Sequence, residues 1–146
     1  MLRPLDSDLW CLDSDLRLAP GFHLPIRTTV VRLASGGLWL HSPIAIDDPT
    51  AAALAELGPV EHIVAPSLLH HLFAAAARER WPAATLHAPA SLVSKQPKLA
   101  IDRPLAEDSR WPELAIVQIA GAPSIDEHIF VLGGGLISLT LGLRDR

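Results

Sequence analysis

Apolar and polar positions alternate along the first part of the chain in the way that predicts β-strands. Residues 8–14 (DLWCLDS) and 27–34 (RTTVVRLA) predict two strands, and residues 37–43 (GLWLHSP) predict a third. The Ser-Gly-Gly sequence at 35–37 lies between the last two, and glycine tolerates the positive φ of a tight turn. The second and third strands are therefore expected to form a β-hairpin.

Two later segments have the apolar spacing of helices. Residues 47–58 (DDPTAAALAELG) predict a helix that Asp48 caps and that ends at Gly58. Residues 67–80 (SLLHHLFAAAARER) predict a second helix, for which Ser67 is the expected cap. The apolar positions with helical spacing in this second segment are Leu69, Leu72, Phe73 and Ala76.

Short apolar segments between and after these helices predict further strands. Strand, helix, strand, helix and strand follow one another with short links, which is the order of βαβ units in a parallel sheet. Residues 88–112 have weak periodicity and predict a surface excursion with a short helix. The further strands are expected at 61–65, 84–89, 113–121, 128–132 and 136–143.

The composition is that of one globular domain over residues 1–146. Apolar residues make up 49% of the 146, which is ample material for a hydrophobic core. Twelve Lys and Arg against sixteen Asp and Glu give a net charge of −4, and the basic residues form no dense run. Nucleic acid is therefore not an expected partner, because binding phosphates requires a concentrated positive surface.

The single cysteine and the chain's hydropathy limit the possible metal sites and the cellular location of the protein. Cys11 has no second cysteine to pair with, so we expect a buried structural thiol and no thiolate zinc cluster. The first ten residues lack the apolar core of a signal peptide, and the apolar stretch at 129–143 is short and broken by glycines. These features predict a soluble cytoplasmic protein with no membrane partner.

Histidines supply the candidate chemistry. His70 and His71 fall in the first turn of the second predicted helix, where the helix dipole favours the neutral, metal-binding imidazole. Neighbouring residues on a helix point about 100° apart, so the pair suits two ions, or one ion and a substrate, better than one ion. His41, at the end of a predicted strand, is the third candidate ligand. His23 and His87 are weaker candidates.

The same histidines also have a structural interpretation. His70 and His71 would then bond to backbone carbonyls at the sheet edge, and His41 would be a partly buried, hydrogen-bonded strand-end residue. Ser42 and Ser67 lie close to histidines in the sequence, so catalysis by a serine and a histidine is a further hypothesis. The chain contains no Gly-x-Ser-x-Gly motif to support it.

The order of hairpin, helix, buried strand and histidine-bearing turn resembles the metallo-β-lactamase-like fold. Three stretches, LRPLDSDLW, RTTVVRLASGGLWLHSP and AP…HHLF, more specifically resemble the domain-of-unknown-function family 4336. The likeness covers most of residues 2–132 and ends near Gly133. It implies an α/β fold, an αββα layered sandwich that is abbreviated at its C-terminus.

The resemblance also implies where metal ligands are replaced. Active members of the superfamily carry a His-x-His-x-Asp-His motif, and its last two residues align with His70 and His71. Pro66 and Leu68 then stand at the positions of the first two histidine ligands. Neither side chain has a lone pair to offer a metal ion, so the usual zinc site is expected to be incomplete.

A similar replacement is implied in the second half of the chain. The turn at 121–123 (GAP) stands where active members carry another histidine ligand, and the first acidic residue after the last predicted strand is Asp145. The favoured function is therefore a degenerate domain that binds a small ligand or a partner and needs no cofactor. The alternatives are a mononuclear zinc hydrolase and a homodimer formed through an open sheet edge. In the hydrolase, the ligands of a zinc-activated water would be His41, His70 and His71.

Overall fold

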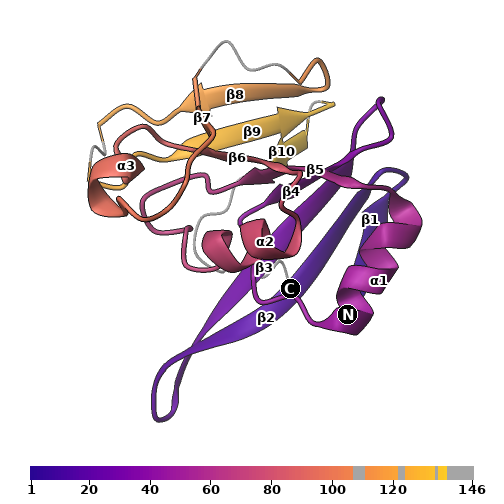
Figure 1. Ribbon diagram of the computed structural model, residues 1–146, viewed down its shortest axis with the longest axis horizontal. Coiled ribbons are helices and arrows are strands. Elements are labelled where there is room, and N and C mark those ends of the chain that lie inside the picture. The colour runs from indigo at the N-terminus through magenta and orange to yellow at the C-terminus, as the bar shows by residue number, and fades with distance from the viewer. Residues whose placement is uncertain (107–110, 122–123, 134, 138–146) are drawn as a thin grey trace.

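The computed structural model describes residues 1–106, 111–121, 124–133 and 135–137, which form two β-sheets and short helices (Figure 1). The larger sheet contains, in spatial order, β1 (Leu2–Asp6), β2 (Leu9–Ala19), β3 (Phe22–Arg32), β4 (Leu38–His41), β5 (Val60–Val64), β6 (Thr85–Ala88) and β7 (Arg103–Pro104). The smaller sheet contains β8 (Leu114–Gln118), β9 (His128–Leu132) and β10 (Gly135–Ile137). The helices are α1 (Asp48–Leu57), α2 (Ala74–Arg80) and α3 (Leu92–Lys95).

The larger sheet changes from antiparallel to parallel at β4. Strands β1 to β4 pair as antiparallel neighbours, and the predicted hairpin is confirmed by the pairing of β3 with β4. From β4 onward, β5, β6 and β7 are added in parallel, which confirms the predicted βαβ order. The carboxyl ends of β4, β5 and β6 therefore meet at one edge of the sheet.

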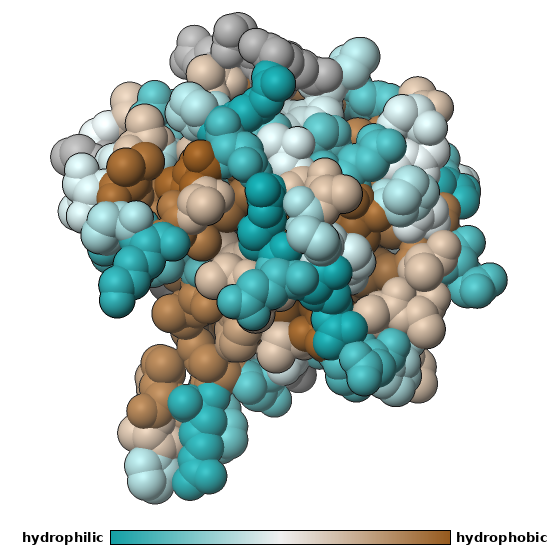
Figure 2. All heavy atoms as spheres, viewed as in Figure 1, coloured by the Kyte–Doolittle hydropathy of each residue, from teal (hydrophilic) through white to brown (hydrophobic). Residues whose placement is uncertain are grey.

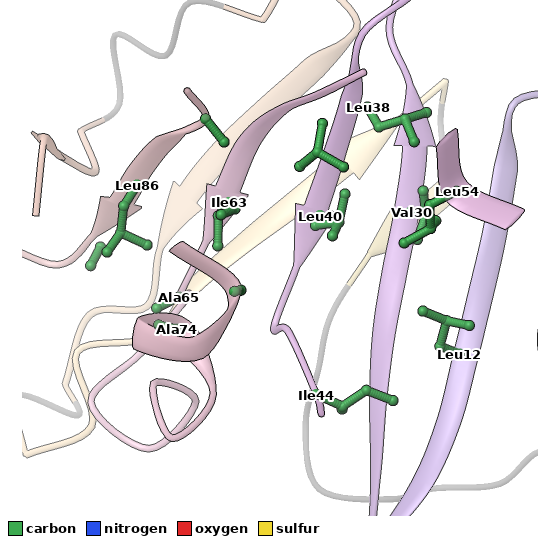
Figure 3. Packing of buried hydrophobic residues seen from close by; sticks show 14 of the residues in the cluster. Leu12, Val30, Leu38, Leu40, Ile44, Leu54, Ile63, Ala65, Ala74 and Leu86 are labelled. Carbon is green, nitrogen blue, oxygen red and sulfur yellow. The ribbon is translucent and has the colours of Figure 1, made fainter. Parts of the chain in front are cut away.

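One hydrophobic core lies between the larger sheet and helices α1 and α2. Leu40, Ile63 and Leu86 contribute from three neighbouring parallel strands, and all three are fully buried (Figure 3). Leu54 of α1 and Ala74 of α2 belong to the same cluster. This layer fixes the parallel strands in place, because removing apolar surface from water is the main favourable contribution to folding.

A second core lies between the two sheets. Trp39 of β4 packs against Phe130 of β9, with ring centroids 4.8 Å apart, and against Trp111, with centroids 5.7 Å apart. Both contacts have the edge-to-face geometry that aromatic rings favour. Residues two apart on β4 share one face, so His41 faces the same interior as Trp39.

Helix α1 begins one residue away from the predicted cap. The Asp47 carboxylate accepts the Thr50 amide at 2.9 Å, so Asp47 is the N-cap and the prediction of Asp48 was wrong. The cap must have an extended backbone, and Asp47 has φ −80° and ψ 168°, whereas Asp48 is already helical. Gly58 follows the helix as predicted. A Cβ at Gly58 would lie 2.3 Å from the Gly36 carbonyl oxygen, so the helix end packs directly on the hairpin turn.

The second predicted helix begins much later than expected. Helix α2 starts at Ala74, and residues 67–71 form an irregular loop, so the prediction that His70 and His71 lie in a first helical turn was wrong. The Leu68 amide donates to the Ile125 carbonyl at 2.8 Å, which commits the loop backbone to another segment. Leu72 is 61% exposed, so the apolar spacing does not correspond to a buried helix face.

The first predicted strand is also longer than expected, and β1 was not predicted. Strands β2 and β3 extend past the body of the protein as a hairpin arm over residues 14–25, with its turn at Pro20 and Gly21 (Figure 1). Figure 2 shows apolar residues along this arm, among which Leu18 is 55% and Phe22 58% exposed. Strand β1 was not predicted because it contains a proline and charged residues, which are uncommon in strands.

The remaining predictions concern the later strands. β8 and β9 confirm the strands expected at 113–121 and 128–132, and the short helix α3 falls within the predicted excursion. The strand expected at 136–143 is described only to Ile137, and its later residues lie outside the described part of the chain. Within the described ranges, no helix has the length and apolar character needed to cross a membrane.

Candidate functional site

The candidate site lies where strands β4 and β5 end. His41 is the last residue of β4 and pairs with Val64, the last residue of β5. The next residue, Ser42, donates its amide to the Val64 carbonyl at 2.8 Å and so continues the parallel pairing by one step. The loop with His70 and His71 follows β5. We call His41, Ser42, His70 and His71 the strand-end cluster.

His41 is fully buried, and its polar atoms have no partner. Its ring stacks on Trp39, with centroids 5.5 Å apart, and meets the Phe130 ring edge-on at 5.4 Å. Among the atoms that the structure describes, neither Nδ1 nor Nε2 of His41 has a hydrogen-bond partner. Burial, and to a smaller extent His70, lowers the pKa of His41 to about 3. A neutral ring therefore presents one N–H and one lone pair with nothing to meet them.

His70 is held by the hydroxyl of Ser42. The Ser42 Oγ lies 3.1 Å from Nδ1 of His70, which is hydrogen-bonding distance. Burial, followed by the neighbouring His71, lowers the pKa of His70, so its ring is neutral at physiological pH. Ser42 has an unusual backbone, with φ 55°, and its carbonyl accepts the Thr28 hydroxyl at 2.9 Å.

His71 is the second residue of the cluster with an unpartnered ring nitrogen. Its Nδ1 is buried and has no hydrogen-bond partner among the described atoms. Burial and the charge of Lys95 lower the pKa of His71, and a hydrogen bond with the backbone of Leu68 has the opposite effect. The Lys95 ammonium donates to the Leu68 carbonyl at 2.8 Å, so a cation lies at the margin of the cluster.

The loop between β5 and α2 is fixed by the segment that leads into β9. The amide of Leu68 donates to the Ile125 carbonyl, and the amide of His128 donates to the Pro66 carbonyl at 2.9 Å. The buried Ser67 hydroxyl accepts the Leu69 amide at 3.2 Å, which is a local turn and not a helix cap. The smaller sheet therefore helps to position His70 and His71.

Of the two weaker candidates, His87 lies opposite Val64, which in turn lies opposite His41, so it is two strands away from His41 at the same register. His87 of β6 pairs with His62 of β5, with 3.1 Å between His62 Nδ1 and His87 Nε2. The Trp111 ring packs edge-on against the His87 ring at 4.8 Å. Burial, His62 and Arg103 lower the pKa of His87 to about 4. His23 lies opposite Arg17 on the exposed hairpin arm.

Two histidines were missed in the sequence, the half-buried His62 and the buried His128. His62 lies two residues before Val64 on a short buried strand, so period-2 alternation places it on the inner face, and this signal was available. His128 opens β9 and is 5% exposed, with its Nδ1 3.3 Å from the Asp126 carbonyl. Its position near the loop of His70 depends on the packing of two sheets, which no local pattern indicates.

The positions that the resemblance aligns with metal ligands contribute to packing. Leu68 is 9% exposed and belongs to the core under helices α1 and α2. Pro66 is buried, and its carbonyl accepts the His128 amide. In the 121–123 turn, only Gly121 lies within the described residues, where it is exposed, and Asp145 lies outside them.

The number of ligands that zinc requires can be compared with the histidines of the strand-end cluster. A catalytic zinc site requires about three protein ligands arranged around one point. In the described ranges, no group of three or more His, Cys, Asp or Glu side chains is placed to hold a metal ion. The side chains that the structure describes therefore do not supply such a site by themselves. The assignment of His41, His70 and His71 as ligands stays a prediction.

Comparison with solved structures defines the class of fold. A metallo-beta-lactamase from Hirschia baltica matches with a TM-score of 0.71 at 12% identity, covering 91% of this chain and 66% of that one. One from Pontibacter korlensis gives 0.70 at 19% identity, covering 90% and 66%. The mono-zinc form of FIM-1 from Pseudomonas aeruginosa gives 0.66 at 18%, covering 90% and 64%. The chain thus has a metallo-β-lactamase-like α/β fold and spans 64 to 66% of the length of these enzymes.

The particular family follows from the sequence match. Residues 6–101 match the family described as Domain of unknown function (DUF4336), and the chain belongs to that family. The matched range contains β2 to β6 and therefore every residue of the strand-end cluster. No curated protein matches the chain.

Proposed function

We propose that this chain binds a small polar molecule at the strand-end cluster and lacks the dinuclear metal site usual in its superfamily. The observation that carries the proposal is His41, which is fully buried with both ring nitrogens unpartnered among the described atoms. Buried polar atoms in folded proteins almost always have a partner, because an unmade hydrogen bond costs about 1–3 kcal/mol. A bound molecule at the carboxyl ends of β4 and β5 supplies that partner.

The chemistry of the cluster restricts the molecule that fits. Both ring nitrogens of His41 and Nδ1 of His71 have no partner among the described atoms, whereas Nδ1 of His70 already meets the Ser42 hydroxyl. A neutral His41 therefore offers one donor and one acceptor, and His71 offers one further position. Lys95 is the cation whose charge reaches His71. A compact ligand with both donors and acceptors, either neutral or with a single negative charge such as one carboxylate, matches this set. A polyphosphate does not, because it would need several cations.

The proposal is tested with protein labelled with ¹⁵N in its histidine rings. A library of small carboxylates and amides is added, and ring nitrogen resonances are followed by NMR. We expect binders to shift the nitrogens of His41 and His71, with His62 and His87 as the internal control. Binders that shift only the His62–His87 pair, or no binder in the library, would contradict the proposal.

A mononuclear zinc enzyme is the second candidate, and the unpartnered nitrogens of His41 and His71 are what favour it. Zinc content of protein purified without added metal separates the two candidates. We expect less than about a tenth of an equivalent. If zinc is present in stoichiometric amount, the His70→Ala and His71→Ala variants decide its ligands, because loss of either ligand should release it.

A further inference from the structure

Ser42 has a strained backbone that its neighbours hold in place. Its φ of 55° is in the left-handed region, where among the described residues other than glycine only Asp126 also lies. Its amide donates to Val64, and its carbonyl accepts the hydroxyl of Thr28, which also accepts the Ile44 amide at 2.9 Å. Strain that the surroundings enforce in this way is common at functional sites.

The strained turn directs the Ser42 hydroxyl to a histidine that can act as a base. The Oγ of Ser42 is 3.1 Å from Nδ1 of His70, and the His70 side chain is half-buried. A serine on a sharp turn directly after a strand, bonded to an imidazole, is the arrangement that activates serine as a nucleophile. Ser42 is flanked by His41 and Pro43, and no helix begins directly after this turn. The turn therefore does not need the flanking glycines of an elbow in which a helix packs closely behind the serine.

We propose that Ser42 and His70 form a nucleophile–base pair that transfers a short acyl group from an activated ester. This activity deepens the proposed function, because it rests on the same strand-end cluster as the binding site. No carboxylate is recorded orienting the His70 ring among the described contacts. The pair is therefore a dyad, suited to substrates with a good leaving group.

Each step of the reaction balances. The Ser42 Oγ attacks the carbonyl carbon of the ester, and its proton moves to Nδ1 of His70. The bond from carbon to the leaving oxygen breaks, that oxygen takes the electron pair, and His70 returns the proton to it. Water then attacks the acyl-serine with His70 again accepting a proton, the bond between carbon and Oγ breaks, and Oγ regains its hydrogen. The ester and water are the only co-reactants.

The burial of the site selects the size of the acyl group. Ser42 is 6% exposed and His41 is fully buried, so a bulky acyl group has no room beside the hydroxyl. An acetyl group is a small acyl group that meets this limit.

The probe is 4-nitrophenyl acetate, whose leaving group is coloured. We expect a burst of nitrophenolate of about one equivalent per chain, and an acetyl adduct on Ser42 by intact mass and peptide mapping. Ser42→Ala should form no adduct, because it lacks the hydroxyl, and His70→Gln should slow adduct formation by about 100-fold or more. Ser94→Ala, at an exposed serine on α3, is the matched control and should react like the wild type.

A glycine variant at position 42 controls for the possibility that Ser42→Ala fails to fold. Ser42→Gly has no hydroxyl but adopts φ 55° without strain, so it should fold normally and form no adduct. Acetylation found only on lysines or the N-terminus, or a burst that persists in Ser42→Gly, would overturn the dyad.

The same samples separate failure of the dyad from failure of the binding site. If small carboxylates shift the His41 nitrogens by NMR but no acetyl-serine forms, the dyad is wrong and the proposed binding function stands. If neither the shifts nor the adduct appear, both are wrong. If Ser42 is acetylated and the shifts also occur, both are supported.

Discussion

Two pairs of histidines, each with one buried and one half-buried member, differ in whether their rings bond to one another. His62 and His87 lie on neighbouring strands with ring nitrogens 3.1 Å apart, so the acceptor of one ring meets the donor of the other. His70 contributes to the lowered pKa of His41, but both ring nitrogens of His41 lack hydrogen-bond partners among the described atoms. The first pair joins one nitrogen of each ring within the fold, whereas His41 has unused hydrogen-bonding capacity where the parallel strands end.

This difference shows that burial alone does not indicate a binding site. All four rings have a pKa lowered mainly by burial, and those of His41 and His87 fall to about 3 and about 4. A low pKa therefore marks both pairs equally. The two pairs differ in whether their hydrogen-bond donors and acceptors have partners. In a purely structural pair the buried donors and acceptors are paired within the protein, whereas in a binding site some are left for the ligand.

The largest expected effect is an opposite change in stability on replacing one ring in each pair with phenylalanine. His41→Phe should raise the free energy of unfolding by about 1–3 kcal/mol, because it removes a buried donor and acceptor that have no partner. His87→Phe should lower it by about 1–2 kcal/mol, because His62 is left without its partner. Both values come from urea unfolding monitored by circular dichroism.

The two variants are controls for one another, because each exchanges an imidazole for a slightly larger ring. A general cost of overpacking would lower the stability of both. If His41→Phe proves as destabilising as His87→Phe, then His41 has partners in solution that belong to the protein, and the contrast between the two pairs is lost.

The next effect is on the pH dependence of stability. A folded-state pKa of about 3 for His41 and about 4 for His87 is below the unfolded value of 6.5, so between these limits the unfolded chain binds more protons. Stability is therefore fully present above pH 6.5 and falls as the pH is lowered, by up to about 1.4 kcal/mol per pH unit for each buried ring. Urea midpoints measured from pH 7 to pH 4.5 give the slope.

Replacing one ring at a time sharpens this prediction. His41→Phe and His87→Phe should each reduce the slope by up to about one proton, because each removes one group that titrates only on unfolding. A slope unchanged in His41→Phe would mean that His41 protonates in the folded state near its usual pKa, and so is not enclosed as described.

The smallest expected effect concerns the margin of the strand-end cluster. The charge of Lys95 lowers the pKa of His71, so Lys95→Met should raise it, and NMR titration of the ring should detect the change. The His62–His87 pair has no such contribution from Lys95 and should titrate as in the wild type. An unchanged His71 would place the Lys95 ammonium farther from the cluster.

Much of the sheet was predictable because its signals are local. The hairpin turn at 35–37 and the alternation of strands with helical segments are encoded within short windows of sequence, and the structure confirms both. The start of α2 was not predictable in this way. Helical spacing in 67–80 is real, but the backbone of Leu68 bonds to Ile125, and this contact spans more than fifty residues.

The site divides in the same manner. His41 was predicted as a strand-end residue, and it lies there, because strand ends can be read from alternation. Its enclosure by Phe130 depends on the packing of the smaller sheet, which no local pattern contains. The contact between Ser42 and His70 likewise depends on the conformation of the loop that carries His70 and on the positive φ of Ser42. Neither can be predicted from the sequence LHSPI.

The most direct test of the central claim is a crystal structure of the protein as purified, with anomalous data collected at the zinc edge. We predict a non-metal molecule or a displaceable solvent cluster within hydrogen-bonding reach of the His41 nitrogens, and none between His62 and His87. An anomalous peak bound by His41, His70 and His71, or protein groups that pair with both nitrogens of His41, would contradict it.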